Sequence, residues 1–411
     1  MPAEQCSTLT DVVRELPDPR ARRGRRYDWG TLVLLVVAAV ASGQPTGAAI
    51  AQWVREHAAE WQQWRPTRHG RIPSAATLRR TLQRLDAPTL ERRLSAWAAQ
   101  QLQADDARQA REAAREREAA GAPPIQPAKE AAPLRGLAVD GKAVRGAQRH
   151  GARVHLVSLV THTPTLVLGQ QAVDHKSNEI PAVQALLRGR DLHGWLVTLD
   201  AMHTQVKTAR LILAQGGHYL MVVKDNQRSL FAALSAWFAE PAWDAERAGT
   251  LQCQEKGHGR LERRTLTRRV LDPRLRLWPG ARQALRRTCW TRVLATGQVR
   301  EATTYALTSL PPIDATHAAR ATTAELARVE ALWRGLWRIE NSLHWVRDVT
   351  YHEDAGQGAL GAAPQALAAF RNAVLTRLRC QGWTNMAAAG RHLAASVATV
   401  FDFLGCPRLV T

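Results

Sequence analysis

One change of pattern divides this sequence near residue 134. Residues 8–100 carry apolar residues at helical spacing and almost no strand signals, whereas short β-rich runs begin after residue 134. Between them lies a segment that is charged on every side, followed by a proline-rich stretch up to residue 133. This combination is typical of a solvated spacer and linker. We therefore predict a helical amino-terminal domain (8–100), a charged helix and linker (101–133) and a larger domain (134–405).

The amino-terminal domain contains one long apolar run and one basic helix. The run, Leu32 to Ala41, is shorter than the ~18–20 residues that a membrane span needs, so it predicts a buried helix and no membrane partner. In the helix after Ser74, leucines recur at helical spacing, and three arginines lie away from them: Arg79, Arg80 and Arg84. That basic face suits either a groove of DNA or simple solvation.

The larger domain has the pattern of an α/β fold. Three strands are predicted at 137–140, 154–161 and 165–173, then a helix at 179–187 and alternating strands and helices up to residue 238. This order describes a mixed sheet flanked by helices. Residues from about 240 to 320 predict a β-rich insertion, with strand-like segments at 263–270 and 288–310. A long helix from residue 323 to about 346 follows, with further helices at 364–379 and 385–395.

The balance of charge points to a polyanionic partner. The chain has 56 Lys and Arg against 36 Asp and Glu, a net charge of +20. Such an excess favours nucleic acid, although an arginine-rich and alanine-rich composition also has a source in genome base composition. The five cysteines are odd in number and far apart, so neither a disulfide framework nor a Cys-x-x-Cys metal site is encoded. We expect a cytoplasmic protein.

Three carboxylates stand out by position. Asp140 and Asp200 each end a predicted strand, and Glu340 lies on the long late helix. Acids at the carboxyl ends of adjacent strands lie side by side, where open α/β sheets build their sites. Paired acids bind hard divalent cations, and two such ions promote phosphoryl transfer. A single strand-ending Asp is more often a turn former or helix cap, so the prediction depends on the three together.

The late helix carries chemistry on one predicted face. Trp333, Trp337, Glu340, His344 and Arg347 follow one another at steps of three or four residues. An acid, a histidine and an arginine among aromatic residues suit a pocket for a DNA end, in which a flipped base stacks on tryptophan. The alternative is a packed core with an ion-paired glutamate.

Five ordered motifs resemble those of the insertion-sequence transposases of the ISAs1 family, which includes the H-repeat-associated proteins and belongs with the broader IS4-like DDE transposases. They are VDGKAVRG (139–146), TLDAMHTQ (198–205), YLMVVKDNQ (219–227), HGRLE (258–262) and WRIENSLHWVRDV (337–349). The resemblance covers about residues 8–405. It implies an RNase H-like catalytic core, interrupted by the β-rich insertion between the second and third acids.

The resemblance also implies roles for particular residues. Asp140, Asp200 and Glu340 are expected to be the catalytic acids that bind two Mg²⁺ or Mn²⁺ ions. The broader group carries a Tyr, Arg, Glu and Lys signature on the last helix, and this chain has Trp333, Leu336, Glu340 and Arg347 at those places. Arg347 keeps a cation that can bind phosphate. Leu336 removes the expected arginine, which Arg334 or Arg338 can replace.

Further polar residues surround the three acids in the sequence. We expect contacts with DNA from the basic face of the amino-terminal helix and from Lys142, Arg145, Lys224, Asn226, Arg338 and Arg347. Lys142 and Arg145 are alternatively exposed loop charges, and Lys224 and Asn226 alternatively shape the site. Secondary candidates are His203, Trp337, Asn341 and His344. Each histidine is expected to orient water or phosphate, or to hydrogen-bond a metal-binding carboxylate.

These features together predict a DDE transposase. Such an enzyme binds terminal inverted repeats in double-stranded DNA, cleaves the ends with water and joins the 3′-hydroxyl to target DNA. Handling two ends at once implies a homodimer. Two alternatives stay open: a decayed or repurposed transposase that only binds DNA, and an RNase H-like nuclease that does not join strands.

Overall fold

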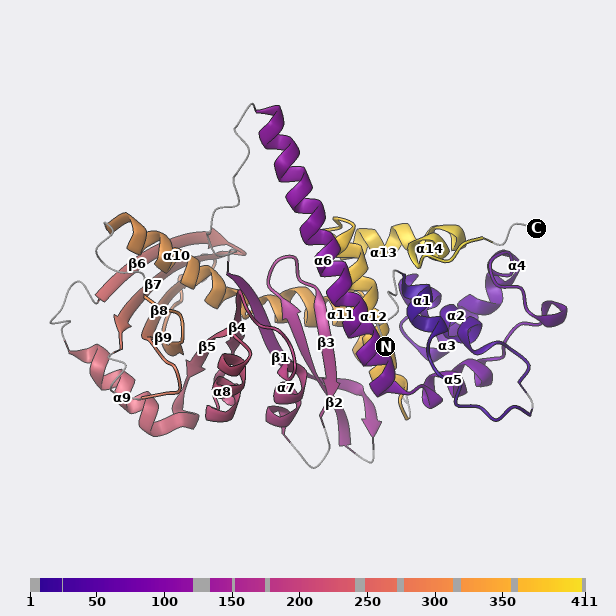
Figure 1. Cartoon of the computed structure of the whole chain (residues 1–411), viewed down its shortest axis with the longest axis horizontal. Helices are drawn as coiled ribbons and strands as arrows, with labels where there is room; N and C mark the ends of the chain where they lie inside the picture. The colour runs from indigo at the N-terminus through magenta and orange to yellow at the C-terminus, as the bar shows by residue number, and fades with distance from the viewer. Residues whose placement is uncertain are drawn as a thin grey trace. The chain divides into compact units, whose positions relative to one another are not determined.

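The protein is described here by a computed structural model (Figure 1), which places residues 8–23, 25–120, 134–149, 152–173, 178–240, 248–271, 277–312, 319–355 and 361–408. The chain forms two compact units. The first comprises Met1–Glu130, Gly141–Asn178 and Ile339–Thr411, and the second comprises Ala131–Asp140 and Glu179–Arg338. The proline-rich part of the predicted linker, residues 121–133, lies outside the described residues. Within the described segments, no helix is long and apolar enough to cross a membrane.

Five short helices begin the first unit. They are α1 (Leu9–Arg14), α2 (Trp29–Ala41), α3 (Gly47–Glu56), α4 (Ala58–Trp61) and α5 (Ala75–Arg84). The side chains of Asp28 and Ser74 each accept a hydrogen bond from a backbone N–H in the first turn of the helix that follows, which satisfies a donor that the helix leaves unpaired. Helix α2 is buried on all sides from Thr31 to Ala41, which confirms the prediction of a buried helix.

Helix α6 (Ala87–Ala119) runs unbroken across residue 100, where the sequence pattern predicts a domain boundary. It buries Leu90, Leu94 and Trp97 and packs on β3 (Val167–Ala172) and α12 (Ala363–Cys380). Helix α12 also contacts α2 and α5, and α13 (Met386–Ala394) and α14 (Val397–Phe403) follow it. The amino-terminal helices therefore share one compact unit with the carboxyl-terminal helices, because α2, α5, α6 and α13 all contact α12.

A mixed sheet forms the centre of the α/β part of the chain. Strands β1 (Arg135–Arg149), β2 (Ala152–Thr161), β3, β4 (Trp195–Leu199) and β5 (His218–Val223) lie in the order β3-β2-β1-β4-β5. Strand β4 is parallel to β1 and to β5, whereas β2 and β3 are antiparallel to each other. Helices α7 (Glu179–Leu187), α8 (Val206–Ala214) and α9 (Arg228–Ala239) connect or follow these strands. The mixed α/β, RNase H-like fold that the resemblance implies is confirmed.

Four antiparallel strands extend the second unit beyond β5. They are β6 (Ala248–Gly257), β7 (Arg260–Val270), β8 (Gln283–Val293) and β9 (Val299–Thr308), and β9 pairs with β5. The prediction of one strand-like segment over 288–310 is wrong, since a turn at 294–298 separates β8 from β9. Gly297 takes a φ of 70° in that turn, which glycine adopts without a steric cost. Helix α10 (Ala319–Gly335) packs on β6 and β7.

Candidate active site

The segment around Glu340 departs from the predicted continuous helix. Helix α10 ends at Gly335, and the N–H groups of Leu336 and Trp337 each bond to a carbonyl three residues back. A π-helical turn then spans Glu340–His344, before α11 (Trp345–Val349). Single π-helical turns inside helices are frequent at functional sites, because the extra residue re-aims the side chains around it.

The break also corrects the prediction of one shared face. Trp333 is buried, whereas Trp337 is 56% exposed with the guanidinium of Arg287 above its ring at 4.9 Å. Glu340 is exposed, but His344 and Arg347 are buried. The five residues therefore do not form one stripe. Trp333 lies in a core, as the packed-core alternative predicts, whereas Trp337 is open to solvent.

Glu340 and His344 form a hydrogen-bonded pair across the π-helical turn. His344 Nδ1 donates to Glu340 Oε2 at 3.1 Å. This bond lowers the pKa of Glu340, since its effect and the nearby charges of His344 and Lys142 outweigh partial burial. The side chain of His344 is only 4% exposed, whereas that of Glu340 is 64% exposed. A fixed imidazole thus holds an ionised carboxylate that remains open to solvent.

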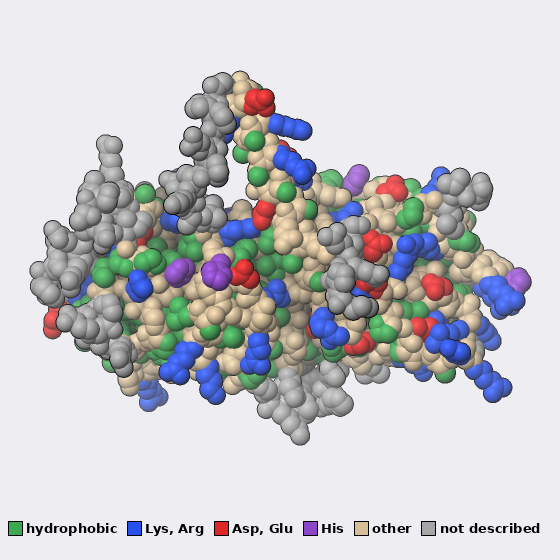
Figure 2. Space-filling model, viewed as in Figure 1, with side chains coloured by type: hydrophobic (Ala, Val, Ile, Leu, Met, Phe, Trp, Pro, Cys, Tyr) green, Lys and Arg blue, Asp and Glu red, His purple; other side chains and the backbone are tan. Residues whose placement is uncertain are grey.

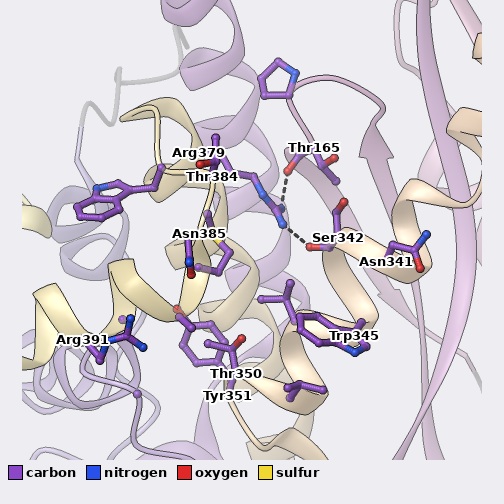
Figure 3. Close-up of a pocket in the computed structure, with 18 of the residues that line it drawn as sticks. Thr165, Asn341, Ser342, Trp345, Thr350, Tyr351, Arg379, Thr384, Asn385 and Arg391 are labelled. Atoms are coloured by element: carbon purple, nitrogen blue, oxygen red, sulfur yellow. Dashed lines mark hydrogen bonds between the residues drawn. The ribbon is translucent and has the colours of Figure 1, made fainter. Parts of the chain in front are cut away.

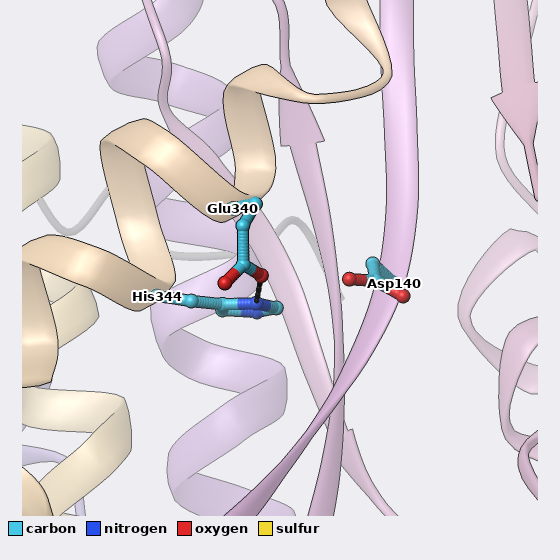
Figure 4. A group of neighbouring side chains, drawn as sticks. All are labelled: Asp140, Glu340 and His344. Atoms are coloured by element: carbon cyan, nitrogen blue, oxygen red, sulfur yellow. Dashed lines mark hydrogen bonds and ion pairs between the residues drawn. The ribbon is translucent and has the colours of Figure 1, made fainter. Parts of the chain in front are cut away.

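Asp140 lies beside this pair. Strand β1 continues to Arg149, so the prediction that a strand ends on Asp140 is wrong. Asp140 immediately precedes Gly141 and Lys142 on that continuous strand, and those residues belong to the unit that holds Glu340. Ligand atoms of Asp140, Glu340 and His344 all lie within 4.8 Å of one another (Figure 4). Two carboxylates at this spacing fit a divalent cation, and carboxylate oxygen is the donor that Mg²⁺ and Mn²⁺ prefer.

Asp200 directly follows β4, the strand that is paired with β1. Val139 is paired with Leu199 in the parallel register of β1 and β4, so Asp140 and Asp200 take the next positions on adjacent strands. Strands in a sheet lie about 4.8 Å apart. The carboxylate of Asp200 pairs with Lys224, whose Nζ is 3.1 Å from Oδ1, and it is not part of the group formed by Asp140, Glu340 and His344. Both side chains of the pair are about half exposed, so this ion pair is weak and exchangeable.

Two residues that the sequence assigns to DNA lie inside the protein. Lys142 is 8% exposed and its Nζ is 2.5 Å from Asp348, with Glu353 and Asp354 at 3.5 Å. Arg347 is fully buried, with Nη2 2.7 Å from Glu353 Oε2. Neither side chain can touch DNA in this arrangement.

Glu353 is the acid that holds this buried network together. Burial opposes its ionisation, but Arg347 and Arg371 outweigh that effect and lower its pKa to about 2. Arg371 Nη1 lies 3.0 Å from Glu353 Oε1. The network joins β1 to α11 and α12, and so it fixes the strand that carries Asp140 against the helix that follows Glu340. No local pattern could reveal it, because an Arg and a Glu with no periodic apolar partner are typical of a surface.

The other predicted residues fall into two groups. Arg145, Arg338 and Asn341 are exposed, and Arg145 lies 3.6 Å from Asp354. His203 and Asn226 instead hold the loop after Asp200. His203 is 1% exposed with Nε2 3.1 Å from Glu179 Oε2, and Asn226 Nδ2 donates to the carbonyl of Ala201 at 2.9 Å. His203 is buried under this loop, whereas Asn226 is exposed and holds the loop through its amide alone.

An open groove adjoins the π-helical turn (Figure 3). It has a volume of about 1060 Å³ and lies along Asn341, Trp345 and Val349, of which Trp345 is 56% exposed. Arg379 spans the groove wall and donates to the carbonyls of Thr165 and Ser342. Trp345 lies within the last of the five motifs, but its position in the sequence does not show whether it faces a core or solvent, so its exposure is seen only in the structure.

The chain is similar to known transposases. A family described as "Transposase DDE domain" matches residues 131–357, and a family described as "DDE_Tnp_1-associated" matches residues 10–98. A protein of Escherichia coli O157:H7 named "Putative transposase YncI" is 27% identical over 382 residues, covering 90% of this chain and 87% of that protein. The "H repeat-associated putative transposase YhhI" of Escherichia coli (strain K12) is 30% identical over 250 residues, covering 59% of this chain and 63% of that protein.

Proposed function

The chain belongs to the transposase DDE domain family, and we propose that it binds terminal inverted repeats and catalyses metal-dependent cleavage of DNA ends followed by strand transfer. The observation that supports this proposal most directly is the convergence of Asp140 and Glu340, with His344, within 4.8 Å. Asp200 stands at the next position on the adjacent strand. Two acids at matching positions of adjacent strands and a third acid on a helical turn are a donor set for two Mg²⁺ or Mn²⁺ ions.

The reaction exchanges phosphodiester bonds. In cleavage, water forms a P–O bond while the P–O3′ bond breaks, which leaves a free 3′-hydroxyl. In joining, that 3′-oxygen forms a bond with a target phosphorus and one target P–O3′ bond breaks. In each step the nucleophile loses a proton and the leaving oxygen gains one. Neither step consumes a nucleotide or requires a covalent protein intermediate.

The positions of the residues suggest a separate role for each in this reaction. Bound divalent cations would supply Lewis acidity to the attacking and leaving oxygens. Asp140, Asp200 and Glu340 would hold these cations, and the buried His344 keeps the carboxylate of Glu340 ionised and oriented. Imidazole is a poor ligand for Mg²⁺, so we assign His344 a positioning role. The ion pair with Lys224 neutralises Asp200 until a cation replaces it.

Two copies of the chain are proposed to act together, because a transposition event joins two ends. DNA beside the cut is proposed to lie along the groove of Trp345, where an exposed aromatic ring can stack on a base. The exposed Trp337 and Arg338 lie just before Glu340 and are proposed to contact the same DNA.

A DNA-binding protein without cleavage activity is the second candidate. The observation that favours it is the pairing of Asp200 with Lys224, which leaves only two of the three acids in the group around Glu340.

Product analysis separates these functions. Wild-type protein is incubated with a duplex that carries the terminal repeats and with a target plasmid, in Mg²⁺, in Mn²⁺ or in EDTA. We expect cut ends and end-to-target joints in either metal and none in EDTA. Cut ends without joints would identify a nuclease, and binding without either product would identify the DNA-binding protein.

A further inference from the structure

A hollow lined by arginine lies at the amino-terminal end of the first unit. Its volume is about 510 Å³, and half of the twelve side chains around it are arginines: Arg20, Arg23, Arg25, Arg26, Arg80 and Arg84. No Asp or Glu lines it. Four of the arginines come from the turn before α2 and two from α5, so two segments more than fifty residues apart build one surface, which we call the arginine hollow. Blue side chains are seen over this end of the unit in Figure 2.

The turn that supplies four of these arginines is held in place by specific contacts. Arg20 Nε lies 2.8 Å from Asp18 Oδ1, and Arg25 Nη1 lies 3.3 Å from Asp18 Oδ2. Arg20 also donates to the carbonyl of Tyr27 and lies over the ring of Trp29 at 5.2 Å. Tyr27 Oη donates to the carbonyl of Ile72 at 2.9 Å, just before α5. These contacts join the two ends of the turn to each other and join Tyr27 to the segment that precedes α5.

The charge of the hollow is not balanced within the protein. Asp18 serves Arg20 and Arg25, but Arg23, Arg26 and Arg84 have no ion-pair partner among the residues that the structure describes. The nearby carboxylates of Asp28 and Asp86 cap α2 and α6, where they accept backbone N–H groups. Several guanidinium groups held close together without counter-charges are a site for an anion.

We propose that the arginine hollow binds the phosphate backbone of duplex DNA while the exposed face of α5 lies against the same duplex. The proposal rests on the proposed function in taking DNA as the polyanion. Guanidinium groups fork to phosphate oxygens, and the four that Asp18 does not pair are enough to contact more than one phosphate. Thr77 and Thr81 of α5 also line the hollow. The hollow shares no residue with the group of Asp140, Glu340 and His344, so it anchors DNA without taking part in the chemistry.

The salt dependence of binding tests this proposal. The variant Arg23→Ala/Arg26→Ala/Arg84→Ala removes three exposed cations, and the matched control Arg111→Ala/Arg115→Ala/Arg117→Ala removes three from the exposed end of α6. Each phosphate contact contributes about 0.9 to the slope of log affinity against log salt. We expect the hollow variant to lose about 2 to 3 units of slope and roughly 10- to 100-fold in affinity at 0.1 M salt. The control should stay close to wild type.

Three further measurements distinguish backbone binding from sequence-specific binding and from unfolding. A random duplex should lose as much affinity as the terminal repeat, since backbone contacts carry no sequence information. The Arg→Lys triple variant should keep most of the slope, and an unchanged thermal unfolding midpoint shows that the fold is retained. Equal slopes for the hollow variant and the control overturn the proposal, as does a loss confined to the terminal repeat. Wild-type protein that binds through the hollow but never cleaves would reject the proposed function alone.

Discussion

At the scale of single residues, burial separates the charged side chains that face solvent from those that form internal ion pairs. Glu340 is exposed, and its hydrogen bond with His344 lowers its pKa. Lys142 and Arg347 are instead buried cations that form ion pairs with acids inside the protein. The sequence correctly predicts that charged residues gather here. It could not predict which of them face solvent, because burial depends on α12, which comes from a distant part of the chain.

Substituting His344 tests whether the imidazole positions Glu340. In His344→Ala the hydrogen bond to Glu340 Oε2 is lost, so the carboxylate is no longer fixed. Loss of such an outer partner typically weakens metal binding about 10- to 100-fold, and we expect the Mg²⁺ concentration for half-maximal cleavage to rise by that factor. The control His193→Ala changes an exposed histidine on the other unit. An unchanged Mg²⁺ requirement would remove His344 from the site.

Glu353 makes a separate prediction about stability and pH. Its pKa falls from an ordinary 4.5 to about 2 on folding, so its stabilising contribution is present above about pH 4.5 and is lost as pH falls towards 2. Glu353→Gln leaves Arg347 and Arg371 buried without an opposite charge, which costs about 3–5 kcal/mol. Urea unfolding of both proteins at pH 7 and pH 3 checks this. The difference between them should shrink at pH 3, and a constant difference would contradict the account.

At the scale of elements, the site depends on a local departure from regular helix. A pattern of residues at steps of three and four predicts one continuous helix, yet the chain breaks after Gly335 and winds a π-helical turn at Glu340–His344. Periodicity correctly locates most helices and strands here, because their apolar residues face a core. It does not locate the break, since burying Trp333 and exposing Trp337 depends on contacts with Arg287 from β8.

Removing one residue from the π-helical turn tests its role. Deletion of Asn341 should restore α-helical spacing, which rotates Glu340 by about 100° relative to Arg347 and the buried network. We expect cleavage to be lost while DNA binding persists. The matched variant Asn341→Ala keeps the length of the turn, so it should lose far less cleavage activity than the deletion. Full activity of the deletion variant would show that the π-helical turn has no function.

At the scale of the whole molecule, two units share the strand β1, and the acids come from segments far apart in the sequence. Local alternation and turn residues correctly predict strands alternating with helices and a β-rich insertion, but they end β1 too early and do not separate β8 from β9. The sharing of one unit by the amino-terminal and carboxyl-terminal helices was beyond the sequence pattern. Both ends have amphipathic helices, and nothing in their spacing states that α12 is the surface on which they meet.

The central claim is that Asp140, Asp200 and Glu340 act as one metal-binding set. We would measure Mg²⁺-dependent cleavage of a terminal-repeat duplex by Asp140→Asn, Asp200→Asn and Glu340→Gln, with Glu112→Gln, an exposed acid on α6, as the matched control. Because even outer partners contribute about 10- to 100-fold, each of the three variants should lose more than about 100-fold in rate while DNA binding stays intact. Near wild-type cleavage by any one of them, Asp200→Asn in particular, would contradict the assignment.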